Sequence, residues 1–468
     1  MLVLFSAIGG VFAIVLAIGS IATFFVACRS FEFVFGVTLA LFCLDAIAVG
    51  LPIFSIGKNI QIFDPLAIVV FLAGLSRIAF GFTKNVGTPH WLQISLLALM
   101  VIPLATGFKA NGMAAAPDFR WFFHFLAFSL YASSFDFNRI DFDRLAKYML
   151  IAGASIALLV YFRWVAEAAG LSIANTWFQV GAGRRFRVIN AAQTYVLAQA
   201  ALLLLVMKTV TTDCPSKNSS TGISGFLSRS AIAIAGLGLI TAFALMHRSV
   251  WACCIAGIVT LSVVAPEFRK QVIRMSWVSS LLMIVALVPL GAFGYLDTFF
   301  DSLAKSVSEV GEHHSSFADR YLGWQALLQE WWVRGNILNY ATGLPFGSGY
   351  YRRIAEFGSS YYAEYTPHNF YIQTLLRTGI VGVALFCSLV AATGARLFLS
   401  AKNSDRSNNS SATWFKFFLL LAVTMQAVFM FAYGARLEQG LFFGLAMGYV
   451  ALQQRQKEAT SVREVNSL

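Results

Sequence analysis

The side chains best suited to chemistry are a histidine and several arginines beside apolar segments. His368 stands in the segment YTPHNFY (residues 365–371), where a long polar stretch gives way to an apolar run that continues through Gly379 and Gly382. The polar stretch is the one large hydrophilic segment of this sequence. The sequence therefore places a titratable imidazole at the boundary between a hydrophilic loop and an apolar helix expected to span a membrane.

The arginines gather at similar boundaries. Arg184, Arg185 and Arg187 lie within four positions of each other just before an apolar run, and Arg248 lies at the turn between two apolar runs. An arginine is costly to hold at such a place without an anionic partner. Its planar guanidinium matches phosphate oxygens bidentately, so two or three such groups suit a diphosphate without a metal. The alternative is that some of them extend to lipid headgroups.

Composition indicates the elements that position these residues. The chain is 58% hydrophobic and 12% charged, with a mean hydropathy of +0.71, which excludes a soluble domain. Apolar runs of about 20 residues match the ~30 Å hydrocarbon core of a bilayer, and they predict an all-α polytopic membrane protein with about 12–13 transmembrane helices and one large, partly helical loop. The expected spans are residues 2–27, 31–54, 62–82, 91–107, 119–135, 146–168, 190–208, 226–246, 248–265, 272–294, 369–396, 412–433 and 438–453.

Basic residues predict the orientation, because cytoplasmic loops retain Lys and Arg. One set of alternate loops is rich in these residues and includes the C-terminal tail, so we expect that set in the cytoplasm. The opposite face then receives the segment 184–190, the turn 247–249 and the long loop from about residue 295 to 367. The net charge of +12 follows largely from this bias and gives no reason to expect nucleic-acid binding. The chain divides into an N-terminal transmembrane bundle (1–294), a loop domain (295–368) and a C-terminal transmembrane part (369–468).

The large loop has the pattern of a folded domain. Apolar and aromatic residues recur at helical spacing over 316–334, which predicts an amphipathic helix. The glycine-rich segment 343–349 interrupts regular structure, and a cluster of tyrosines follows it. These tyrosines suit either an interfacial aromatic belt or stacking against sugar rings. His313 and His314 are adjacent and lack nearby partners in sequence to complete a metal site, so we expect no metal.

A resemblance to a known family rests on the histidine segment. His368-Asn369, followed after nine residues by Gly379 and after two more by Gly382, resembles the signature of the O-antigen ligase and O-antigen (exopolysaccharide) polymerase superfamily of bacterial inner-membrane glycosyltransferases. The resemblance extends over roughly residues 184–396. The earlier spans match this family only as generic apolar helices.

Other segments resemble further parts of the same family. DRYLGW (319–324) and GLPFGSG (343–349) precede the histidine in the order of the family's periplasmic loop. MHRSVWA (246–252) resembles its arginine turn between paired spans, although His247 stands where a small residue is more usual. RVINAA (187–192) resembles its upstream Arg and Asn segment.

The resemblance implies an inverting, metal-independent transfer, without a cofactor, at the periplasmic face of the bacterial inner membrane. The donor would be a glycan on undecaprenyl diphosphate and the acceptor a hydroxyl of another glycan. His368 would act as the base, since imidazole titrates near neutral pH, and the arginines would stabilise the departing diphosphate. The diphosphate-binding residues would be Arg185, Arg187, Arg248 and Arg320, the supporting residues Asn190, Trp324 and Asn369, and the acceptor-binding residues Tyr350, Tyr361 and Tyr365.

Alternatives remain open within and outside this class. The tyrosine-rich loop slightly favours a polymerase, which extends a lipid-linked chain, over a ligase, which transfers the finished chain to lipid A core. A transporter or flippase would also have many spans, but it often shows internal repeats and charges at the bilayer midplane, and the sequence has no convincing repeat. A receptor or scaffold for polysaccharide assembly would use the aromatic loop and tolerate loss of His368.

Overall fold

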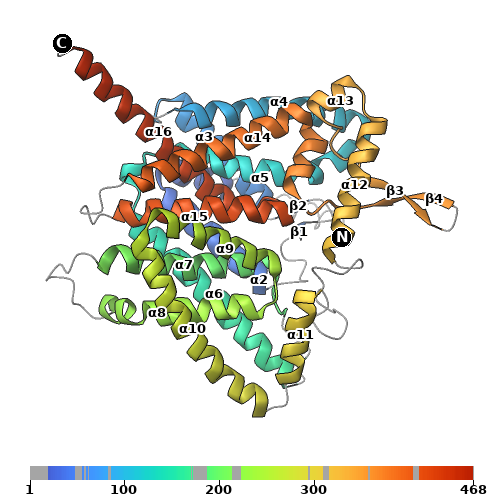
Figure 1. Ribbon diagram of the computed structural model, residues 1–468. Coiled ribbons are helices and arrows are strands. Elements are labelled where there is room, and N and C mark those ends of the chain that lie inside the picture. The colour runs from blue at the N-terminus through green and yellow to red at the C-terminus, as the bar shows by residue number, and fades with distance from the viewer. Residues whose placement is uncertain are drawn as a thin grey trace, which may run out of the picture.

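The structure is a computed structural model that describes residues 19–47, 55–56, 60–61, 63–82, 86–169, 171, 187–212, 223–292, 296–308, 316–356, 359–403 and 411–466. Helices dominate these residues (Figure 1). The sheets within the described residues are two short antiparallel hairpins, β1 (Ser55–Ile56) with β2 (Ile60–Gln61) and β3 (Tyr351–Glu356) with β4 (Ser359–Glu364). The prediction of an all-α architecture is confirmed.

The bundle contains the helical segment Gly19–Arg29 and the longer helices that follow it. These are α2 (Phe31–Ile47), α3 (Phe63–Ala79), α4 (Thr88–Asn111), α5 (Ala115–Ser133), α6 (Phe142–Ala168), α7 (Ala191–Thr212), α8 (Ile223–Ala244), α9 (Arg248–Val264), α10 (Pro266–Ala292), α14 (Phe370–Lys402), α15 (Ser411–Ala432) and α16 (Leu437–Asn466). Short 3-10 turns, η2 (Gly112–Ala114) and η3 (Phe137–Arg139), precede α5 and α6. Each expected span from 31–54 onward coincides with one of these helices, while the span 2–27 lies mostly outside the described residues.

Five helical stretches of the described chain are long and apolar enough to cross a bilayer. They are Thr88–Ser133, Phe142–Glu167, Ala191–Val210, Phe370–Lys402 and Thr413–Ala432. The first of them contains both α4 and α5. These stretches confirm a polytopic membrane protein, whereas the total of about 12–13 crossings stays a prediction.

Large apolar side chains on the outside of the bundle agree with this assignment. Leu158 of α6 is 69% exposed, and Trp277 of α10 is 76% exposed. Soluble monomers rarely expose apolar surface to this extent, whereas a bilayer favours it. The outer faces of these helices are therefore suited to contact lipid.

The centre of the bundle is aromatic and closely packed. Phe370, the first residue of α14, has its ring centroid 5.0 Å from that of Phe122 on α5 and 5.2 Å from that of Phe386 further along α14. Gly440 and Gly444 of α16 lie against the backbone of α5, where a Cβ atom would meet carbonyl oxygens. Small residues at such contacts let membrane helices approach closely. The start of α14 is consequently anchored in the core of the bundle.

The expected loop contains α11 (Leu296–Ser308), α12 (Ser316–Arg334), α13 (Ile337–Thr342) and the β3–β4 hairpin, with Tyr351 opposite Glu364. Leu327 and Trp331 of α12 form a small apolar cluster with Tyr350 and with Leu376 of α14. Figure 1 shows α12, α13 and the hairpin at one end of the bundle and α11 apart from them near α10, while the C-terminal part of α16 extends beyond the other end. The predicted amphipathic helix is α12, which buries Leu327 and Trp331 and exposes Val333.

Candidate active site

His368 lies in the short connection between β4 and α14. Its φ is 45°, in the left-handed region that a non-glycine residue adopts only when its surroundings hold it there, and its side chain is exposed. The next residue, Asn369, is the N-cap of α14 and is 2% exposed. Its Oδ1 accepts hydrogen bonds from the backbone N–H groups of Tyr371 (3.0 Å) and Ile372 (3.1 Å). Helix capping thus holds the backbone that presents His368.

His368 lines a cavity of about 330 Å³ built from distant parts of the chain. The walls come from α5, the start of α7, the first turn of α14 and the turn between α15 and α16. Side chains that line it include Trp121, Asn190, His368, Gln373, Tyr433 and Arg436. The cavity combines an imidazole, amides, a guanidinium and aromatic rings, which suits a polar ligand with an anionic group.

Helix α12 joins the His368 segment to the turn between α15 and α16. The Trp324 indole N–H donates to the carbonyl oxygen of Pro367, directly before His368. Arg320, one helical turn earlier, donates from Nη1 to the carbonyl oxygen of Ala432 (3.2 Å), and its guanidinium lies 5.4 Å from the ring centroid of Tyr433. Two of the residues predicted from sequence, Arg320 and Trp324, therefore hold the edge of the cavity.

Burial and the positive charge of Arg320 both lower the pKa of His368 below its ordinary value. Desolvation is the larger cause, although the imidazole remains accessible from the cavity. Both effects disfavour the protonated ring. At neutral pH His368 is consequently in the form that accepts a proton.

The upstream segment 187–192 and the arginine turn 246–252 are hydrogen-bonded to each other. Arg187 donates from Nη2 to the carbonyl oxygen of Met246 (2.7 Å), and His247 Nε2 lies 3.0 Å from the carbonyl oxygen of Ile189. Arg248 follows His247 as the first residue of α9. The predicted residues Arg187 and Arg248 thus belong to one paired structure, which Asn190 connects to the cavity.

The structure gives a reason for the histidine at position 247, where the family pattern more often has a small residue. The side chain is 6% exposed, and burial lowers its pKa to about 4, so the ring is neutral at physiological pH. A neutral imidazole donates one hydrogen bond, here to Ile189. The His247 imidazole thereby joins the turn 247–249 to the segment 187–190.

Asn190 has a role in positioning as well as a place in the cavity. Its Oδ1 accepts from the backbone N–H of Gln193 (2.9 Å), and the Gln193 side chain accepts from the backbone N–H of Asn190 (3.1 Å). This reciprocal pair is a capping box at the start of α7. Like Asn369, Asn190 ends a loop and begins a buried helix beside the cavity.

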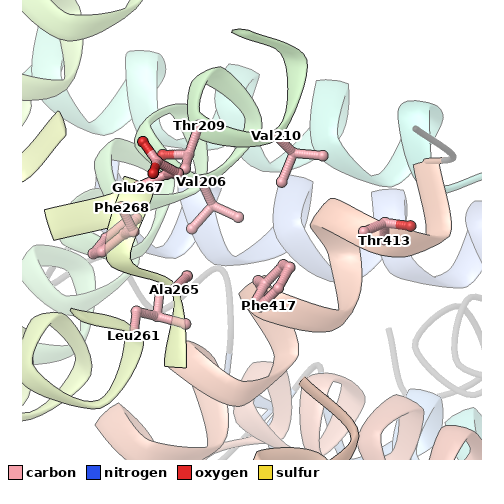
Figure 2. A pocket seen from close by; sticks show the side chains of 9 residues that line it. All are labelled: Val206, Thr209, Val210, Leu261, Ala265, Glu267, Phe268, Thr413 and Phe417. Carbon is pink, nitrogen blue, oxygen red and sulfur yellow. The ribbon is translucent and has the colours of Figure 1, made fainter. Parts of the chain in front are cut away.

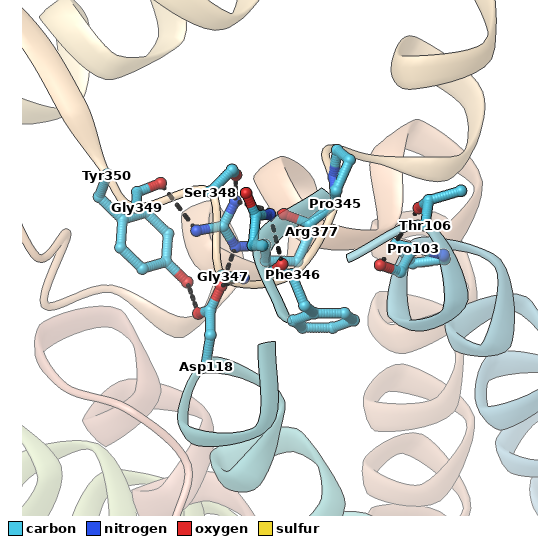
Figure 3. Close-up of polar contacts among 11 residues, drawn as sticks. Pro103, Thr106, Asp118, Pro345, Phe346, Gly347, Ser348, Gly349, Tyr350 and Arg377 are labelled. Atoms are coloured by element: carbon cyan, nitrogen blue, oxygen red, sulfur yellow. Dashed lines mark hydrogen bonds and ion pairs between the residues drawn. The ribbon is translucent and has the colours of Figure 1, made fainter. Parts of the chain in front are cut away.

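The glycine-rich segment is fastened to the bundle by a buried ion pair (Figure 3). Arg377 of α14 is fully buried, and its Nε lies 2.7 Å from a carboxylate oxygen of Asp118 on α5. Arg377 also donates to Ser348 Oγ (2.6 Å), and Asp118 accepts from the backbone N–H of Gly347 (2.9 Å) and from the Tyr350 hydroxyl (2.7 Å). Sequence reasoning missed this network, although an arginine inside an expected span was a signal for it.

The three predicted acceptor tyrosines lie in different environments. Tyr350 is 9% exposed, and burial raises the pKa of its hydroxyl. Tyr361 is 47% exposed on β4. The guanidinium of Arg352 lies over the ring of Tyr365, with its Cζ 4.4 Å from the centroid of that ring. Tyr350 acts within the buried network, so Tyr361 and Tyr365 are the more accessible of the three.

Sequence reasoning also missed Arg436, which lines the cavity in the turn between α15 and α16. The signal was a lone arginine between two apolar runs, the same pattern that pointed to Arg248. Arg184 and Arg185, as well as His313 and His314, lie outside the described residues.

A second cavity in the bundle is much smaller than the His368 cavity. Its volume is about 30 Å³, and side chains such as Val206, Leu261 and Phe417 line it (Figure 2). It lies near the first turn of α15, whereas the His368 cavity lies at the last turn of that helix and the residues that follow it. Its size, about that of one water molecule, and its largely apolar lining are typical of a packing void.

Comparison with known proteins agrees with the resemblance seen in the sequence. Residues 227–387 match the family model described as O-antigen ligase. The matched segment contains Arg248, Arg320 and His368, and it supports assignment to the O-antigen ligase and polymerase superfamily. No curated protein matches the chain.

Proposed function

Since residues 227–387 carry the O-antigen ligase match, we propose that the protein transfers a glycan from undecaprenyl diphosphate to a hydroxyl of an acceptor glycan. The reaction takes place at the periplasmic face of the bacterial inner membrane, with the C-terminus in the cytoplasm. The observation that carries this proposal is that His368 is exposed, lines the cavity and is subject to the positive charge of Arg320. This combination of base and cation suits a group transfer with an anionic leaving group.

The chemistry follows from the two kinds of side chain. The acceptor oxygen attacks the anomeric carbon while the bond from that carbon to the diphosphate oxygen breaks, and the electron pair stays on the diphosphate. His368 accepts the proton of the attacking hydroxyl. A single displacement inverts the anomeric configuration. The residues proposed to stabilise the leaving diphosphate are Arg185, Arg187, Arg248 and Arg320.

Supporting residues act through the backbone that carries these groups. Asn369 and Asn190 begin α14 and α7, and the Trp324 indole is bonded to the residue before His368. Precise placement of a base matters because a displacement of about 1 Å can reduce the rate ~100-fold. These three residues are positioning residues in the proposal.

We favour a polymerase, in which the acceptor is a second lipid-linked glycan. Tyr361, which is exposed on the projecting β3–β4 hairpin, provides an aromatic face suited to a sugar ring, and Tyr365, with Arg352 over its ring, lies at the base of the same hairpin. The second candidate is a ligase that transfers the chain to lipid A core, and the description of the matching family favours it. Both reactions use the same base and the same diphosphate site.

The test uses purified protein in lipid nanodiscs with an undecaprenyl-diphosphate oligosaccharide as the sole glycan. We expect wild-type protein to form a ladder of longer products and His368→Gln to form none while keeping its folding and yield. Arg353→Gln, on the exposed face of β3, is the control and retains the ladder. A single transfer that requires added lipid A core would assign the ligase reaction instead. Absence of product from wild type under both conditions contradicts the proposal.

A further inference from the structure

Two arginines meet at the turn between α15 and α16: Arg436 belongs to the turn, and Arg320 contacts it from α12. Tyr433 and Arg436 line the His368 cavity. Arg320 binds the same turn through the carbonyl oxygen of Ala432 and the ring of Tyr433. Arg436 lines the cavity itself, and the charge of Arg320 on α12 acts on His368, so the electrostatic potential at the cavity has a contribution from each of them.

Arg436 is fixed in place by its surroundings. Its Nε lies 2.9 Å from a carboxylate oxygen of Glu438, which is 1% exposed. Its guanidinium also lies 5.3 Å from the ring centroid of Phe42 on α2, and its charge acts on the carboxyl of Asp45. The Arg436 side chain nevertheless remains 23% exposed. A guanidinium with five N–H donors that contacts Glu438 through Nε retains donors for an anion in the cavity.

Two explanations of this arginine must be separated. A buried carboxylate needs a cation, so Arg436 would be required for stability even without any ligand. That requirement accounts for the ion pair, but a counter-ion for Glu438 has no need to line the cavity that contains His368. A preorganised arginine at the wall of an anion site matches phosphate oxygens bidentately.

We propose that Arg436 binds the diphosphate of the lipid-linked donor and that Glu438 is a positioning residue which orients its guanidinium. This inference rests on the proposed function, since it assigns another ligand to the same substrate group. It extends the diphosphate site to a part of the chain outside the family match, which ends at residue 387.

A double-mutant cycle separates binding from charge neutralisation. Arg436→Gln alone leaves Glu438 buried without its partner, so we expect lower thermal stability and weaker binding of undecaprenyl diphosphate. Arg436→Gln combined with Glu438→Gln removes both charges and restores stability. In this double variant we expect binding of undecaprenyl diphosphate to remain about 10- to 100-fold weaker than in wild type, because a charge-assisted fork is lost. Binding at wild-type strength in the stable double variant overturns the proposal.

Further variants keep the test decisive. If the glutamine pair fails to fold, Arg436→Met with Glu438→Leu removes the ion pair with apolar groups of similar size, and the same loss of binding is expected. Glu438→Asp keeps the counter-ion, and we expect its binding to lie between those of wild type and the double variant. Arg353→Gln serves as the matched arginine control and binds as wild type.

The binding measurement also separates this inference from the proposed reaction. Undecaprenyl diphosphate alone is the probe, and no turnover is needed. If wild type forms no product but binds the probe and the double variant does not, the transfer reaction is wrong while the Arg436 site stands. If wild type forms product and the stable double variant has an unchanged KM for the donor, the reaction stands and the Arg436 site is wrong.

Discussion

Arg377 and Asp118 form a largely buried ion pair between α14 and α5, with Arg377 Nε 2.7 Å from the carboxylate, the Arg377 side chain 0% exposed and that of Asp118 10% exposed. The pair holds the glycine-rich segment through Ser348 and Gly347. It also ties α14, the helix that begins directly after His368 and Asn369, to α5. The proposed site thus depends on an ion pair that contacts none of the proposed substrate-binding residues except Tyr350.

Arg377→Leu should therefore destabilise the protein strongly. The substitution leaves Asp118 as a buried, unpaired charge, and breaking such pairs costs about 3–5 kcal/mol. We expect a large fall in the midpoint of thermal unfolding, measured in detergent, together with loss of product. Combining it with Asp118→Leu should recover part of the stability. A single variant with unchanged thermal stability would show that the pair has no such role.

Arg320→Gln should move the acid limb of the pH–rate profile to higher pH. The Arg320 charge disfavours protonated His368, so its removal lets the pKa of His368 rise towards its ordinary value. The base then becomes protonated at a higher pH. The measurement is kcat/KM against pH, and Arg320→Lys, which keeps the charge, is the control. A limb that moves to lower pH, or does not move, contradicts the interaction between the two residues.

Asn369→Ala should cost about 1 kcal/mol of stability, the usual value of a helix N-cap. The change removes the acceptor for the N–H groups of Tyr371 and Ile372. Asn369→Asp supplies an equivalent acceptor, so we expect it to retain stability and most of the activity. Thermal unfolding and initial rates measured for both variants decide between capping and direct chemistry. An inactive but stable Asn369→Asp protein would assign the amide a chemical role.

Gly379→Ala should be more harmful than its small size suggests. Gly379 has φ 66° and ψ −169°, a region that is essentially restricted to glycine and costs other residues about 1–3 kcal/mol. A Cβ atom there would also meet the backbone of Ala341. We expect reduced thermal stability and a displaced α13. Gly394→Ala is the control, because a Cβ there meets only one side-chain atom at 3.9 Å.

The glycines of the histidine motif illustrate how far a pattern can be interpreted. The spacing from His368 to Gly379 and Gly382 resembles a family signature, but the sequence gives no physical reason for glycine at these positions. Gly379 breaks the helical geometry of α14 where α13 packs against it. The spacing therefore reflects a contact between two elements, which no local pattern shows.

The sequence by itself determined the helices and the identity of the central histidine. Helix formation in a bilayer depends on runs of apolar residues, and these are local, so the expected spans coincide with α2 to α10 and α14 to α16. The amphipathic period likewise predicted α12. His368 was conspicuous because it stands where polar sequence meets an apolar helix.

Only the tertiary structure decided which charged residues share a cavity and which support it. Arg436 lines the same cavity as His368, Arg377 pairs with Asp118, and Tyr350 donates a hydrogen bond to Asp118, each across a long stretch of sequence. These encounters depend on helix packing, because a helix of suitable composition can pack in many positions until close-packed side chains select one. A lone arginine in an apolar run therefore predicts a partner, while packing alone determines whether that partner is a protein carboxylate or a ligand.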